Sequence, residues 1–197
     1  MVEKSTRTIW PPFAAFYAQS MLVNSTSAIA SITRVGEVLQ HISKSEAVDP
    51  LEDIHEADVL DELQNIVVQA AALSRYFWPV RKGHDWRGLD LRRRFEVSEA
   101  SPLKSRDLRN ELEHFDERLD QYLEEGIVGH IIPQYIGPEP EPQQVPLHIF
   151  RAYYFDVGIF HLLGKRHEIV PIAREVHRIH RRLTGAEETP NGANADA

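Results

Sequence analysis

The chain has 197 residues with 30 acidic and 22 basic side chains, a net charge of −8, and no cysteine. The missing cysteines exclude disulfides, thiolate metal sites and a cysteine nucleophile. No apolar run approaches the ~20 residues of a membrane helix, and the first ten residues do not resemble a secretory signal. We therefore expect one cytoplasmic domain, long enough to bury a core and without a membrane partner.

Helical periodicity and helix-end signals predict that most of the first two thirds of the chain is helical. The predicted helices span residues 11–43, about 57–78, and 101 or 105 to 125. Pro11 and Pro12 suit a helix start, Pro79 ends the second helix, and Gly126 stops the third. The basic stretch 79–104 shows little periodicity, so it is predicted to be a connection.

The pattern changes after Gly126, where Ile, Val, Tyr and Phe become frequent and are typical of strands. The predicted strands are residues 127–136, 147–155, 159–163 and 167–170. Gly164–Arg166 is predicted to form a hairpin turn, and Pro171 to open a last helix over residues 172–183. The small, polar residues 185–197 are predicted to be a disordered tail.

These elements predict a mainly α member of the α+β class. We expect an antiparallel helical bundle with a small antiparallel β-sheet and a closing C-terminal helix. The single domain would span residues 1–184, with a helical core at about 10–125, a β-rich appendage at about 127–170 and the last helix at about 171–184.

One candidate site lies on the third predicted helix. Setting this helix at 100° per residue gives it a buried stripe through Leu108, and Arg109 and His114 flank the opposite, polar face. Three Arg-x4–6-His spacings occur in the chain, but only Arg109 is followed by a small polar residue, Asn110. An Arg and a His flanking a polar face become important when a partner covers that face.

This Arg109-Asn110-x3-His114 pattern on a helix resembles the R-x4–6-H motif of the HEPN superfamily. The resemblance implies a small helical bundle that dimerises across this helix. In active members, the Arg and His of both protomers form a metal-independent endoribonuclease site. It also implies a role in prokaryotic defence or toxin–antitoxin systems, with a possible antitoxin partner.

The chemistry of such a site would be RNA cleavage through attack of the 2′-hydroxyl. His114 would act as the general base, since its pKa normally lies near neutrality. Arg109 would stabilise charge on the phosphate, and Asn110 would orient the ring or a phosphate oxygen. No cofactor and no metal would be needed.

Two alternatives stay open. Arg109 can pair with Glu113 at i,i+4, which leaves His114 as a surface or interface residue. The chain would then be a non-catalytic HEPN-like module that dimerises or binds a protein. A small-molecule-binding domain under the sheet is a third hypothesis, without a distinctive residue to support it.

Two basic segments, residues 81–109 and 164–184, each carry a net charge of +4 on this acidic chain. They predict RNA contacts through five arginines, namely Arg92, Arg93, Arg94, Arg174 and Arg178. The alternative is that these arginines lie on solvent-exposed faces of two separate elements and bind nothing. His177 and His180 share a helix face, but the arginines around them oppose a cation, so no metal site is predicted.

Overall fold

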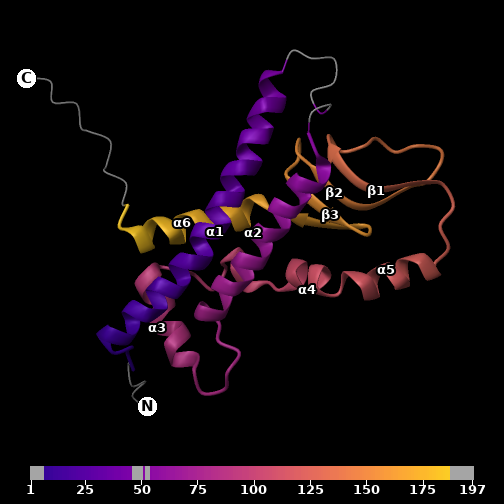
Figure 1. The fold of residues 1–197 in the computed structure, drawn as a ribbon. Coiled ribbons are helices and arrows are strands. Elements are labelled where there is room, and N and C mark those ends of the chain that lie inside the picture. The colour runs from indigo at the N-terminus through magenta and orange to yellow at the C-terminus, as the bar shows by residue number, and fades with distance from the viewer. Residues whose placement is uncertain (1–6, 46–50, 52–53, 187–197) are drawn as a thin grey trace, which may run out of the picture.

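The structure is a computed structural model that describes residues 7–45, 51 and 54–186. It is mainly helical with a small four-stranded sheet (Figure 1). The helices are α1 (Pro11–Lys44), α2 (Glu56–Phe77), α3 (Asp85–Phe95), the 3-10 turn η1 (Pro102–Lys104), α4 (Asp107–Glu113), α5 (Phe115–Glu124) and α6 (Val170–Thr184). The strands are β1 (His130–Gly137), β2 (Leu147–Tyr154), β3 (Ile159–Leu162) and β4 (Lys165–Glu168). Within the described residues, no helix is long and apolar enough to cross a membrane.

The long helix α1 packs along α2 and is crossed by α6 (Figure 1). Its polar middle, which weakens the apolar pattern, is buried at Ser25 and Ser31. These hydroxyls are satisfied because Ser25 hydrogen-bonds the Leu22 carbonyl and His180, while Ser31 accepts from Asn65. Buried serines of this kind let the helices pack while their polar atoms keep partners.

Apolar residues from three helices form the helical half of the core. The buried set includes Met21 and Ala28 of α1, Leu73 and Phe77 of α2, and Val176 and Ile179 of α6. A second cluster joins α1 and α2 to the sheet through Leu63, Ile66, Tyr153 and Phe160. The helices and the sheet therefore share buried contacts.

The sheet has the order β1-β2-β3-β4 and is mixed. β1 and β2 are parallel, with His130 opposite Leu147 and Gly137 opposite Tyr154, whereas the other two pairs are antiparallel. The predicted antiparallel sheet is therefore wrong for this pair. The four prolines in residues 138–146 disfavour a tight hairpin, and the connection returns the chain to the start of β1.

A glycine permits the close approach where the parallel pair begins. Gly129 has φ +139°, and a Cβ on it would lie 2.1 Å from the Pro146 carbonyl oxygen. The neighbouring His130 N–H donates to the same carbonyl. Any larger residue at position 129 would separate the two strand starts.

The connection predicted over residues 79–104 contains a helix, α3, and the turn η1. Helix α3 buries Gly88, Asp90 and Leu91. A buried glycine and a buried aspartate break the apolar period, which explains why the sequence pattern missed the helix. Gly88 is required there, since a Cβ would lie 2.4 Å from the Phe77 carbonyl oxygen.

The third predicted helix starts later than expected and is broken. It begins at Asp107, and His114 leaves helical geometry with φ −114° and ψ 33°, which separates α4 from α5. Helix α5 lies beside the sheet (Figure 1). Its Tyr122 hydrogen-bonds His148 over 2.8 Å and packs edge-on against Phe150. The segment after the break at His114 is thus joined to the sheet through Tyr122.

The remaining boundaries are close to the predictions. Helices α1 and α2 differ from their predicted bounds by one residue at each end at most, and α6 begins two residues earlier than predicted. The turn between β3 and β4 is Leu163–Gly164, so the returning strand starts at Lys165 and ends before Val170. The predicted tail lies outside the described residues beyond position 186.

Candidate functional site

The predicted catalytic residues lie on α4 and at its end. The Arg109 side chain is 19% exposed, and its Nε lies 3.3 Å from Glu113 Oε2. Its Nη2 donates to Asn110 Oδ1 over 2.7 Å. Arg75 of α2 also approaches Glu113, at 3.8 Å. The guanidinium therefore hydrogen-bonds the neighbouring amide and lies within ion-pair distance of Glu113, but its buried Nε makes no hydrogen bond to the described residues.

His114 lies at the break between α4 and α5 and its side chain is 54% exposed. Its Nδ1 is 3.5 Å from Glu117 Oε1. Asn110 contacts this residue through its backbone carbonyl, which accepts from the His114 N–H, while its side-chain oxygen faces Arg109. Within one chain, each of the two motif residues thus has its own carboxylate partner.

The surroundings of the motif are acidic. Glu111, whose side chain is only 12% exposed, is held by Lys165 and Arg118. Residues 107–124 carry two basic side chains, Arg109 and Arg118, so the segment is strongly negative. Its seven acidic residues are Asp107, Glu111, Glu113, Asp116, Glu117, Asp120 and Glu124. Negative potential at this face opposes an RNA phosphate.

Two of the three predicted RNA-binding arginines of α3 bond to the protein itself. Arg92 is 14% exposed, pairs with Glu99 at 2.8 Å, donates to the Phe77 carbonyl and lies over the Trp78 ring. Arg94 pairs with Asp90 at 2.9 Å, and the same carboxylate accepts from the Ile9 N–H. Both arginines thus anchor α3. Arg93 is exposed.

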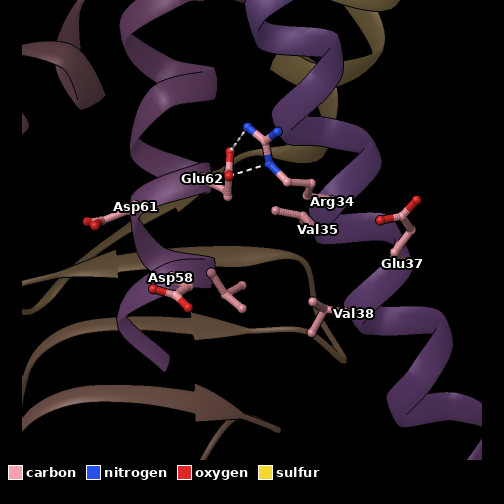
Figure 2. Close-up of a pocket in the computed structure, with 8 residues that line it drawn as sticks. Arg34, Val35, Glu37, Val38, Asp58, Asp61 and Glu62 are labelled. Carbon is pink, nitrogen blue, oxygen red and sulfur yellow. Dashed lines mark hydrogen bonds and ion pairs between the residues drawn. The ribbon is translucent and has the colours of Figure 1, made fainter. Parts of the chain in front are cut away.

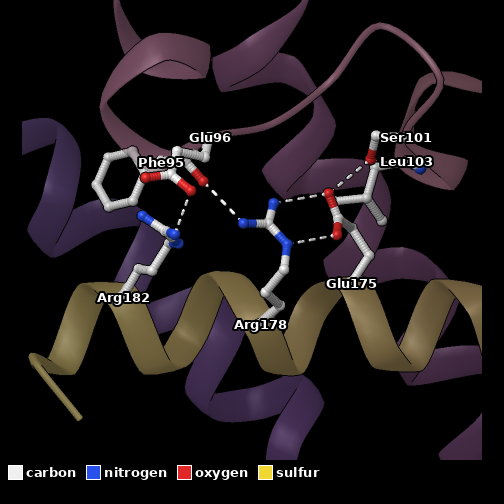
Figure 3. A network of polar contacts seen from close by, with 7 residues as sticks. All are labelled: Phe95, Glu96, Ser101, Leu103, Glu175, Arg178 and Arg182. Atoms are coloured by element: carbon white, nitrogen blue, oxygen red, sulfur yellow. Dashed lines mark hydrogen bonds and ion pairs between the residues drawn. The ribbon is translucent and has the colours of Figure 1, made fainter. Parts of the chain in front are cut away.

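On α6, Arg178 belongs to a polar network that links this helix to α3 and η1 (Figure 3). It forms two hydrogen bonds to the Glu175 carboxylate, at 2.8 and 3.0 Å, and donates to the Phe95 carbonyl. Ser101 donates to the same carboxylate at 2.9 Å, and the neighbouring Arg182 pairs with Glu96. The two basic segments therefore do adjoin, but through bonds that occupy Arg178.

The charges in this network stabilise each other. Burial alone would raise the pKa of Glu175, but hydrogen bonds from Arg178 and Ser101 outweigh it and lower that pKa. The same pair raises the pKa of Arg178. Arg174, one turn before Arg178, is exposed instead and lines a pocket with His177.

An acidic cleft between α1 and α2 was not predicted from the sequence (Figure 2). It encloses about 560 Å³ and is lined by Glu37, Asp58, Asp61 and Glu62. Arg34 closes one side through two hydrogen bonds to Glu62, which lower the pKa of that carboxyl. In the described part of the chain, no three His, Asp or Glu residues are placed to hold a metal.

Two histidines of the sheet were also missed. His161 of β3 and His167 of β4 each have one buried ring nitrogen that finds no hydrogen-bond partner among the described residues. Burial lowers the pKa of both rings. Strand periodicity alone gives no signal for this pair, because the register that brings the two strands together is set by the turn.

Comparisons with protein-family models, with curated proteins and with solved structures find no match to this chain.

Proposed function

We propose that this chain is a HEPN-like, non-catalytic interaction module that forms a homodimer through the polar face of α4 and the start of α5. One observation carries the proposal. Arg109 and His114 each face a carboxylate of their own segment, Glu113 at 3.3 Å and Glu117 at 3.5 Å. A nuclease site would leave the guanidinium available to a phosphate.

The electrostatics of the segment support a protein partner over RNA. A phosphate approaching Arg109 would have to displace Glu113 and then lie beside Glu117. The His114–Glu117 pair is exposed on both sides, and Glu113 is 48% exposed. Exposed ion pairs contribute only about 0–1 kcal/mol, so a protein partner can exchange carboxylates at this face at little cost. A second copy of this face supplies both signs of charge, as an isologous interface requires.

In such a dimer, Arg109 of one protomer would pair with Glu113 of the other across the two-fold axis. The proposed module keeps the helical-bundle architecture that the resemblance to HEPN domains implies and the cytoplasmic location expected from the sequence. An antitoxin-like protein that recognises the same face belongs to the same proposal.

Mixing two charge-reversed variants tests the interface. We expect R109E and E113R each to be monomeric alone, because each places four like charges at the two-fold axis. An equimolar mixture should form a heterodimer, measured by analytical ultracentrifugation. R93E, on an exposed arginine of α3, is the matched control and should stay dimeric. A monomeric wild type, or a mixture that stays monomeric, would rule out this interface.

The second candidate function is a metal-independent endoribonuclease, and the exposure of the His114 ring at the helix break favours it. The test is cleavage of diverse RNAs in EDTA by the wild type, His114→Ala and Arg109→Ala. Cleavage that both substitutions abolish without unfolding would establish the nuclease and overturn the non-catalytic module. Equal or absent cleavage in all three proteins is the result that we expect.

A further inference from the structure

A second cavity, here called the apolar pocket, lies where α1, α2, α6 and β2 meet. It encloses about 360 Å³, within the size range of small-molecule sites. Its floor consists of buried apolar side chains, among them Val35, Leu63, Ile66 and Ile169. Gly36, Arg174 and His177 lie at its exposed rim.

One polar group in this pocket lacks a partner. Tyr153 lines the pocket and is only 4% exposed, yet its hydroxyl makes no hydrogen bond to any described residue. Burial raises the pKa of this phenol, which keeps it a protonated donor. The hydroxyl oxygen is not among the fully buried atoms that lack a partner, so it keeps access to the pocket, where a ligand that brings an acceptor can bond it.

The rim of the apolar pocket is positively charged. Arg174 makes no hydrogen bond or ion pair within the described chain, unlike Arg178 one turn later. Val170, the first residue of α6, also lines the pocket, so the positive end of the helix dipole adds to the field there. An apolar cavity with a free guanidinium and a free hydroxyl is complementary to an apolar molecule with an anionic head.

We propose that the apolar pocket binds a medium-chain fatty acid or a carboxylate of similar shape. The hydrocarbon body would replace water against Val35, Leu63 and Ile66. A carboxylate has two oxygens and several lone pairs, enough to accept from both the Tyr153 hydroxyl and the Arg174 guanidinium. The site lies apart from the α4–α5 face and does not depend on the proposed dimer.

Isothermal titration calorimetry with decanoate, kept below its micelle concentration, tests the proposal. The matched probes are 1-decanol, which has the same chain without the charge, and decyltrimethylammonium, which reverses it. We expect decanoate to bind about tenfold more tightly than decanol, because a charged head gains charge-assisted hydrogen bonds. Equal affinities for the three probes, or no decanoate binding, would overturn the proposal.

Three variants locate the site. Arg174→Met keeps the aliphatic stem and should weaken decanoate binding about tenfold while leaving decanol unchanged; Arg93→Met is the control. Tyr153→Phe removes only the unpaired hydroxyl, so it should fold normally and still bind decanoate several-fold more weakly. Gly36→Leu has open space for its side chain at the rim and should block both probes. Decanoate binding that none of these three changes alters would place the ligand elsewhere and refute the assignment.

Discussion

Helix α6 and the α4–α5 segment (residues 107–124) use the same polar pairs in different surroundings. In α6, Arg178 and Glu175 are three residues apart, and the carboxylate is 14% exposed and receives a further bond from Ser101. In α4, Arg109 and Glu113 are four residues apart, and the carboxylate is 48% exposed. Both pairs lie within one helix, but the α6 pair also hydrogen-bonds Ser101 and the Phe95 carbonyl, whereas the α4 pair meets another element only through Arg75 at 3.8 Å.

The apolar contacts of the two regions differ in the same way. Val176 and Ile179 of α6 are fully buried against α1 and α2, whereas α5 has no fully buried residue. A polar side-chain pair therefore contributes more to the stability of the fold when the surrounding core excludes water. A pair on a solvent-facing helix remains available for exchange with a partner.

The largest expected effect comes from the apolar contacts. We expect Ile179→Ala to lower the free energy of unfolding by about 3 kcal/mol, since it leaves a cavity at a fully buried site. Leu123→Ala in α5, at a residue 46% exposed, is the matched control and should cost less than about 1 kcal/mol. Urea unfolding followed by circular dichroism measures both, and similar losses would contradict the comparison.

The polar network of α6 should give the next effect. Glu175→Gln removes a charge that Arg178 and Ser101 face, so we expect a loss of about 2 kcal/mol in urea unfolding at pH 7. Glu113→Gln in α4 should change stability by no more than about 0.5 kcal/mol.

The lowered pKa of Glu175 adds a pH signature to this comparison. Its stabilisation is present above the unfolded-state pKa of about 4.5 and is lost as the pH falls through the lower folded-state value. The stability difference between the wild type and Glu175→Gln should therefore shrink below pH 4.5. A difference that stays constant down to the acid transition would argue against the network.

A smaller effect, on the pH dependence of stability, is expected from the two buried histidines of the sheet. Burial lowers the pKa of His161 and His167, while Glu111 raises and Lys165 lowers that of His167. The unfolded rings take up protons near pH 6.5 before the folded ones do, so stability should fall as the pH drops below 6.5. His161→Phe should flatten this slope in urea unfolding between pH 7.5 and 5; an unchanged slope would exclude His161 as its source.

The smallest effect on the free energy of unfolding is expected at the Arg109–His114 motif. His114→Ala should change the free energy of unfolding by less than about 0.5 kcal/mol, because the ring is exposed and lies outside both buried clusters. A loss of 2 kcal/mol or more would instead show that the ring holds the break between α4 and α5.

Much of the helical structure could be predicted from local patterns. Pro11 and Pro12 mark the start of α1, and the apolar stripe through Leu60 and Leu63 defines α2. Helix α3 could not be predicted in this way, because tertiary contacts, and not an apolar pattern, bury its Gly88 and Asp90. Gly88 fits against the Phe77 carbonyl, and Asp90 accepts from the Ile9 N–H.

The candidate site was predictable only as a set of residues. The spacing of Arg109 and His114 singled out both side chains and offered the pairing with Glu113 as one alternative. Their chemical surroundings depend on the helix break and on Arg75, a residue of another helix. Arg174 was singled out only as a candidate RNA contact. Nothing in the sequence indicated that Arg174 and the Tyr153 hydroxyl would lack hydrogen-bond partners among the residues that the structure describes.

By itself, the sequence determined the mainly helical character of this protein, the places of its long helices and the existence of a β-rich region. These properties follow from side-chain periodicity and from proline and glycine, which act over a few residues. Tertiary structure decided that β1 and β2 run parallel and that His114 breaks a helix. It also decided that Arg178 is hydrogen-bonded, whereas Arg174 has no hydrogen-bond or ion-pair partner in the described part of the chain. Each of these depends on which distant groups come within hydrogen-bond or packing distance, and only the folded chain sets those distances.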